Sequence, residues 1–224
     1  MKKVLSYLIL CLLIPVSLLM SATVFGGKQY AFLTVSVAIF SCLPMFIAFE
    51  KKEHNTTRLI LIAVMTALSV LGRFVFVMIP AFKPVTAMTV ITALYFGPEA
   101  GFMTGSLTAV ISNFYFGQGP WTPFQMFAFG MLGFFAGILA KPLKKSRLLL
   151  LGYGVLAGVF YSLVLDVFSS LWQDNAFSWA RYGAMLISSL PMTVIYAVSN
   201  VIFLLVLEKP IGEKLARIKI KYDI

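Results

Sequence analysis

Long apolar runs alternate with short polar gaps along almost the whole chain. Most runs are about 20 residues long, which is the length an α-helix needs to cross a hydrocarbon core of roughly 30 Å at 1.5 Å per residue. The pattern therefore predicts an all-α integral membrane protein that crosses the bilayer many times. The eight predicted membrane segments are 4–25, 29–49, 59–80, 85–97, 100–117, 123–140, 148–172 and 182–207.

These segments differ in composition along the chain. The first two carry few polar residues, whereas the six after Arg58 are rich in Gly, Ala, Ser and Thr. We therefore interpret residues 1–50 as an accessory transmembrane hairpin, 58–208 as a six-helix core and 209–224 as a basic cytoplasmic tail. The segment 85–97 is short for a crossing, which is tolerated where protein covers the backbone.

Composition and charge agree with a membrane protein and give its orientation. Sixty per cent of the residues are hydrophobic and 12% are charged, against about half and a quarter in soluble domains. Fourteen Lys and Arg residues fall in the predicted inner gaps, and three, Lys28, Lys83 and Arg181, fall in the outer gaps. Because Lys and Arg accumulate on the cytoplasmic side, this bias predicts a cell-membrane protein with both termini inside. The net charge of +10 lies between apolar runs and does not indicate nucleic-acid binding.

Residues that carry chemistry are scarce. The sequence has no nucleotide-binding loop and no nucleophile with a paired base. Its single histidine, His54, lies in a charged loop, and both cysteines, Cys11 and Cys42, lie in apolar runs. A catalytic function, a metal site and a cofactor therefore have no support, so the energy for any powered transport is expected from other subunits.

A few polar residues lie inside the predicted core helices toward the outer side. At 1.5 Å per residue, Arg73 lies about 22 Å from Arg58 and Asn113 about 22 Å from Pro98. Asp166 and Gln125 fall at a similar level. Buried ions cost several kcal/mol and commonly mark functional cavities, so these groups predict a polar pocket. The alternative is that Arg73 reaches the outer headgroups, or pairs with Asp166 only to hold helices together.

The segment between Asn113 and Gln125 reads NFYFGQGPWTPFQ. Its glycines and prolines predict an outer turn. Tyr115 and Trp121 bring aromatic rings to this turn, and Trp172 lies near the last outer loop. Such residues are common interfacial anchors, but beside the polar level they also fit an aromatic-lined ligand site with a few polar groups.

Small residues recur at four-residue spacing in several segments. The pairs Gly101/Gly105 and Gly133/Gly137 are expected to serve helix packing inside the bundle. Ala63 and Ala67 lie near the predicted cytoplasmic end of their helix, where a helix of another subunit could dock. We therefore interpret this pair as a partner-binding face.

Three stretches carry a resemblance to a known family: RLILIAVMTALSVLGR from Arg58, YFGPEAGFMTG from Tyr95, and residues 113–137. Their order and spacing resemble the substrate-binding S component of energy-coupling factor (ECF) vitamin importers, over residues 58–208. The resemblance implies a six-helix bundle that captures a vitamin or precursor from outside and associates with a transmembrane coupling subunit and two ATPases. It also implies that Ala63 and Ala67 meet the coupling subunit, and that the loop around Lys83 contributes to the pocket.

The segment from Asn113 to Gln125 looks closest to the branch for cobalamin and its lower-ligand precursors, α-ribazole and dimethylbenzimidazole. We therefore expect cobalamin or such a precursor as ligand. The alternatives are another small micronutrient, a self-sufficient secondary transporter, or a membrane enzyme acting on a lipid. The predicted substrate-binding residues are Arg73, Lys83, Asn113, Tyr115, Gln118, Trp121, Gln125, Asp166 and Trp172.

Overall fold

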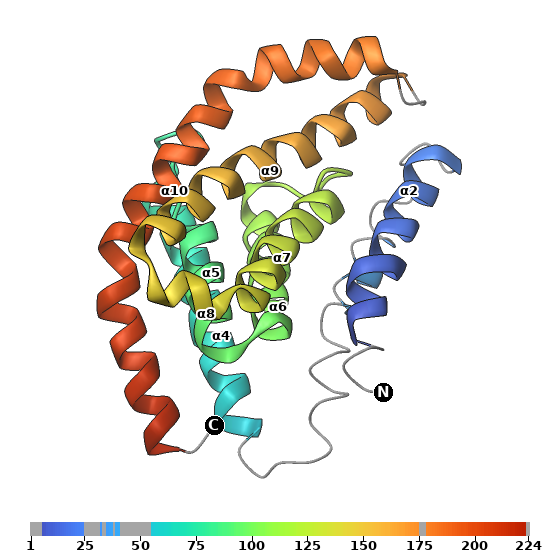
Figure 1. Cartoon of the computed structure of the whole chain (residues 1–224). Helices are drawn as coiled ribbons and strands as arrows, with labels where there is room; N and C mark the ends of the chain where they lie inside the picture. The colour runs from blue at the N-terminus through green and yellow to red at the C-terminus, as the bar shows by residue number, and fades with distance from the viewer. Residues whose placement is uncertain are drawn as a thin grey trace.

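The computed structural model describes residues 6–24, 32, 35–37, 39–40, 55–174 and 178–222. The regular elements in these ranges are all helical, which confirms the predicted class (Figure 1). They are η1 (Ile9–Leu13), α2 (Ile14–Val24), α4 (Asn55–Val75), α5 (Val85–Phe96), α6 (Pro98–Phe116), α7 (Thr122–Ile138), α8 (Ala140–Lys145), α9 (Arg147–Asp174) and α10 (Trp179–Lys221).

Each of the six segments predicted for the core coincides with one long helix, and the short α8 is an addition. The first core helix ends at Val75, whereas its apolar run predicts a helix to residue 80. The residue before a proline avoids the helical conformation, and Pro80 and Pro84 follow closely. The predicted segment 29–49 lies almost entirely outside the described residues, and so do the basic positions that flank it.

Helix α5 forms the centre of the bundle (Figure 1). All of its residues except Tyr95 are buried, and it packs against α4, α6, α7 and α10. Its 12 residues rise only about 18 Å, less than the thickness of a bilayer core. This short helix is compatible with a membrane protein because its neighbours, not lipid, surround it.

Close contact between α6 and α7 depends on glycine. A Cβ atom added to Gly105 would lie 2.4 Å from the carbonyl oxygen of Phe129, and one added to Gly133 would lie 2.3 Å from the backbone of Gly101. Such distances leave no room for a side chain, so the two backbones touch directly. The packing role predicted for these small residues is confirmed.

Helix α10 is 43 residues long and contains Pro191 and Pro210. Proline removes a helical hydrogen bond and bends a helix, and α10 curves around α5 and α9 in Figure 1. The basic segment after residue 208 continues this helix to Lys221. It also packs against the core, because Leu215 is buried and the Lys219 ammonium donates to the carbonyl oxygen of Tyr95 at 3.1 Å.

Three described helical stretches are long and apolar enough to cross a membrane: Thr56–Val75, Arg147–Gln173 and Trp179–Lys221. Shorter apolar helices cover Ser6–Leu18, Val85–Phe96 and Thr122–Ile138. The N-terminal helix α2 lies beside α7 and α9. The preceding turn contributes Tyr7, whose ring meets Phe134 edge-on at 5.0 Å.

Candidate functional site

Arg73 is buried near the end of α4, where it contacts α6. One of its guanidinium nitrogens, Nη1, donates to Ser112 Oγ at 2.5 Å and to Asn113 Oδ1 at 3.0 Å. The guanidinium also lies 5.0 Å from the centre of the Phe116 ring. Arg73 is therefore held by the last turns of α6 and is buried within the bundle, 7% exposed.

Asn113 links α6 to α7. Its amide nitrogen donates to Gln125 Oε1 at 2.8 Å and to Thr122 Oγ1 at 2.9 Å. The chain can bring these groups together because α6 ends at Gly117, whose φ of +102° suits a residue without a side chain. The result is a network of buried polar groups in which Arg73, Asn113 and Gln125 meet, as the sequence predicts.

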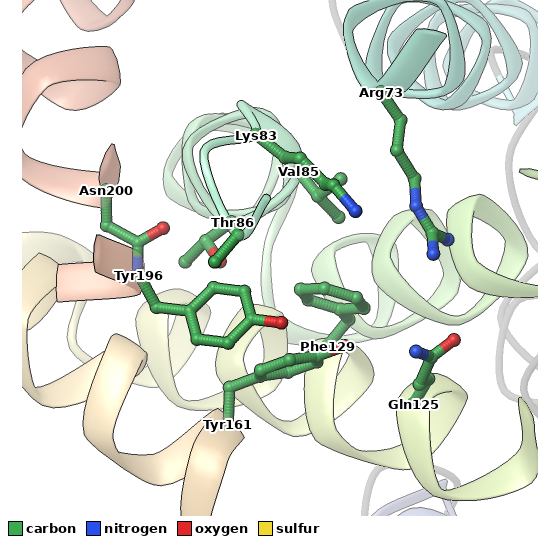
Figure 2. A pocket seen from close by; sticks show the side chains of 10 residues that line it. Arg73, Lys83, Val85, Thr86, Gln125, Phe129, Tyr161, Tyr196 and Asn200 are labelled. Carbon is green, nitrogen blue, oxygen red and sulfur yellow. The ribbon is translucent and has the colours of Figure 1, made fainter. Parts of the chain in front are cut away.

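A cavity lies beside this network (Figure 2). The cavity is small: the space open to a water-sized molecule is about 40 Å³, well below the ~300–1,000 Å³ of typical small-molecule pockets, so side chains must move to admit a ligand. Polar groups from five elements surround it, together with one phenylalanine ring and two tyrosine rings. The lining residues are Arg73, Ala81, Lys83, Val85, Thr86, Gln125, Phe129, Tyr161, Tyr196 and Asn200.

Lys83 reaches the cavity from the connection between α4 and α5. Ser199 on α10 fixes this connection, because its hydroxyl accepts from the Lys83 amide at 2.9 Å and donates to the Lys83 carbonyl at 3.2 Å. Burial, with a smaller contribution from the positive charge of Arg73, lowers the pKa of the Lys83 ammonium from 10.5 to about 8. The ammonium is thus still mostly protonated at neutral pH.

Asp166 does not join this network. Its carboxylate accepts from Ser189 Oγ at 2.6 Å, and it forms no ion pair with Arg73. Ser162 and Thr193 continue the line of hydroxyl groups, with Thr193 Oγ1 donating to Ser162 Oγ at 2.6 Å. We call these four residues the α9–α10 seam. Asp166 is turned away from the cavity because it lies five residues, or about 140° of helix rotation, after Tyr161.

Three predicted aromatic residues do not line the cavity. Tyr115 is 73% exposed, with its ring against Phe74, because it lies about 200° around α6 from the inward-facing Asn113. Trp121 is 40% exposed and its ring covers Gly119. Trp172 is 45% exposed and stacks on Phe168, about 16 Å along α9 from Tyr161.

Gln118 supports the turn between α6 and α7. Its side-chain nitrogen donates to the carbonyl oxygen of Val110 at 2.9 Å. Its side-chain oxygen is buried and finds no partner among the described residues. Gln118 does not line the cavity, so its position fits bracing of the turn.

Several lining residues are not predicted from the sequence: Phe129, Tyr161, Tyr196 and Asn200. Asn200 is an amide inside a predicted membrane segment, so the criterion that selected Asn113 also applies to it. Tyr161 and Tyr196 bring hydroxyl groups into apolar runs, far from the predicted membrane–water interfaces. Their rings meet edge-on at 4.9 Å, and Phe129 stacks on Tyr161 at 4.4 Å.

Ala63 and Ala67 lie on an exposed face of α4. Val64 and Leu68 are also exposed, at 48% and 44%. The small side chains leave a shallow strip between larger apolar ones. The face is therefore accessible to a neighbouring helix within the bilayer.

A comparison with protein families places this arrangement in context. Residues 53–217 match the family model for the ECF-type riboflavin transporter, S component. No curated protein and no solved structure matches the chain. The matched region contains the whole cavity and all six core helices up to residue 217 of α10. This family consists of transporter components and not of enzymes. Membership implies a vitamin substrate and association with a coupling subunit and ATPases. The chain therefore belongs to the ECF-type riboflavin transporter S component family and is a multi-pass membrane protein.

Proposed function

We propose that the chain captures a vitamin or vitamin precursor with a compact, flat heteroaromatic ring and delivers it to an ATP-driven ECF module. The cavity carries this proposal. Phe129, Tyr161 and Tyr196 supply ring faces, and Gln125 and Asn200 supply amides that hydrogen-bond a polar ring edge. Apolar and aromatic walls with a few polar groups are the usual chemistry of a small-molecule site.

Two ligand classes are candidates for this site. The matched family model is described by riboflavin, whose flavin ring is flat and has carbonyl and N–H groups on one edge. The segment from Asn113 to Gln125 resembles the cobalamin branch and contributes Gln125 to the cavity wall. The cavity volume of about 40 Å³ is smaller than any of these ligands, so the site must widen on binding, least for a lower-ligand precursor such as dimethylbenzimidazole and most for intact cobalamin.

Direct binding to the purified chain tests the proposal. The full chain in detergent or nanodiscs is titrated with riboflavin, α-ribazole, dimethylbenzimidazole and cobalamin, without any partner subunit. Mass spectrometry identifies any small molecule that remains bound through purification. We expect one compact ring compound to bind, and Tyr161→Ala to weaken binding by about fivefold to 100-fold, since stacking on an aromatic ring contributes ~1–3 kcal/mol.

Matched variants separate the pocket from other aromatic sites. Trp179→Ala removes a ring that is 79% exposed and is not part of the cavity, so it should leave the affinity unchanged. Equal loss of binding in both variants, or binding of none of the four compounds together with no co-purified ligand, would contradict the proposed function.

We also propose that Ala63 and Ala67 form the docking face for the coupling subunit. Both are exposed on α4, one helical turn apart, and small residues at this spacing let a second helix approach closely. Ala67→Trp should reduce co-purification with the coupling subunit while solute binding to the isolated chain stays intact. Val194→Trp, on an exposed part of α10, is the control of equal bulk. Normal assembly of the Ala67→Trp protein would refute this role.

The N- and C-termini are proposed to lie in the cytoplasm, with the cavity mouth facing out. The bias of Lys and Arg toward one set of gaps supports this orientation. Labelling of single-cysteine variants in intact cells tests it: Lys145→Cys should resist an impermeant reagent, and Tyr115→Cys, at a position that is 73% exposed, should react. Uptake that stops when the ATPases are deleted would separate an ECF component from a self-sufficient secondary transporter.

A further inference from the structure

Two cations face the same cavity. Figure 2 shows the guanidinium of Arg73 and the ammonium of Lys83 both directed into the space between the tyrosine rings and Gln125. They come from different elements, α4 and the connection that follows it. Both lie near one aromatic ring, because Arg73 Cζ is 5.0 Å and Lys83 Nζ is 5.9 Å from the centre of Phe116.

Among the residues that the structure describes, no carboxylate forms an ion pair with either of these two charges. None of the residues that line the cavity is Asp or Glu, and Asp166 is bound to Ser189 in the α9–α10 seam. Arg73 has neutral partners only, the hydroxyl of Ser112 and the amide oxygen of Asn113. No hydrogen bond or ion pair of the described residues involves the Lys83 ammonium, whose recorded contact is the distant Phe116 ring.

Such an arrangement is unfavourable unless a ligand compensates for it. Removing a cation from water costs several kcal/mol per ion, and two like charges at one site repel each other. Contact with an aromatic face offsets only ~0.5–2 kcal/mol of this desolvation cost. A purely structural cation is normally paired with an acid, and neither of these two has an acidic partner within the described part of the chain. The lowered pKa of Lys83 has the same cause, burial beside Arg73.

From this geometry, and resting on the proposed function, we propose that the captured solute carries an anionic group, a phosphate or a carboxylate, that binds between Arg73 and Lys83 while its ring lies against Tyr161 and Tyr196. Arginine offers paired N–H donors that suit the oxygens of such a group, and lysine adds a compact charge. The site would therefore distinguish an anionic ring compound from its neutral parent. Neither the family description nor the resemblance to the cobalamin branch assigns this property.

Matched neutral and anionic ligands test the proposal. The full chain is titrated with riboflavin and riboflavin 5′-phosphate, and with α-ribazole and its 5′-phosphate, at constant pH and low salt. We expect the phosphorylated member of the pair that binds to bind at least tenfold more tightly. Lys83→Gln should reduce this ratio at least threefold, with the remainder due to Arg73, and increasing salt should also reduce it. Lys83 suits this test because its side chain makes no described hydrogen bond, whereas its backbone contacts with Ser199 persist in the variant.

Controls keep the outcomes distinct. Lys145→Gln removes an equal charge from an exposed position on α8 and should leave the ratio unchanged. If the neutral member binds equally well or better, or if Lys83→Gln leaves the ratio as it was, the anion proposal is refuted while the capture function stands. If no member of either pair binds, the flat-ring function fails and this inference fails with it.

Discussion

Arg73 and Asp166 are both ionisable residues inside predicted membrane segments, and each is 7% exposed, yet their surroundings differ. Arg73 meets Asn113 and, through it, Gln125, so three helices converge beside a cavity. Asp166 is satisfied by Ser189 within the α9–α10 seam. The comparison shows that a buried charge marks a cavity only when its helix turns it toward the centre of the bundle.

Arg73 and Asp166 also differ in their hydrogen-bond partners. The partners of Arg73 are neutral, and its charge stays available to a ligand. The carboxylate of Asp166 has a short hydrogen bond from a hydroxyl, and further hydroxyl groups follow at one-turn spacing. We therefore expect substitutions around Arg73 to alter binding strongly, and substitutions in the seam to have small effects.

The largest effect is expected for Asn113→Leu. This change removes one of the two acceptors of Arg73 and the donor to Gln125 and Thr122, and each buried polar group that loses its partner costs ~1–3 kcal/mol. Ligand affinity should fall about 100-fold or more, and the unfolding temperature should drop, as measured by titration and by thermal unfolding in detergent. Unchanged affinity would show that the network does not shape the site.

A smaller effect is expected for Gly105→Ala. The added Cβ would lie 2.4 Å from the carbonyl oxygen of Phe129, so α6 and α7 must separate at a cost of about 1–3 kcal/mol. Gly152→Ala is the matched control, because nothing lies within 4 Å of its added Cβ. Thermal unfolding should show a loss for the first variant and none for the second. Equal stability of both would contradict the close packing of α6 and α7.

Ligand binding is expected to weaken as the pH rises through about 8. The pKa of Lys83 is lowered to about 8, so the charged donor predominates below this pH and the neutral amine above it. If only the charged form binds the ligand, affinity should fall by up to about tenfold between pH 7 and pH 9, since each pH unit past a pKa changes the charged fraction up to tenfold. Titrations across this range should give a flat profile for Lys83→Gln, and an equally steep profile in that variant would exclude Lys83 as the cause.

The smallest effect is expected for Asp166→Asn. The amide oxygen of asparagine can still accept from Ser189, so the seam keeps its hydrogen bond. Ligand affinity should change by less than about threefold and stability by about 1 kcal/mol or less, the net contribution of a typical hydrogen bond. A loss of binding comparable to that of Asn113→Leu would contradict the difference between Arg73 and Asp166 and would show that Asp166 takes part in binding.

Part of the site was predictable from the sequence. Arg73, Asn113 and Gln125 could be selected because polar groups inside apolar runs are few, and counting residues places them at one depth. Asp166 met the same criterion and was selected with them. Depth alone does not give the direction in which a side chain points. Arg73, Asn113 and Gln125 point toward one another, whereas Asp166 points away from them. The aromatic residues near the outer turn, Tyr115 and Trp121, were assigned by proximity in the same way.

The sequence by itself determined the all-helical class and the position of the six core helices, because a helix that crosses lipid must be long and apolar. The order of its motifs also indicated the ECF S component family. Only the tertiary structure decided that Tyr161, Tyr196 and Asn200 share a cavity with Arg73 and Lys83. Their meeting depends on the rotation of each helix about its axis and on backbone contacts such as those of Gly105 and Ser199. These are set by the packing of all helices together, because side chains one residue apart point about 100° apart.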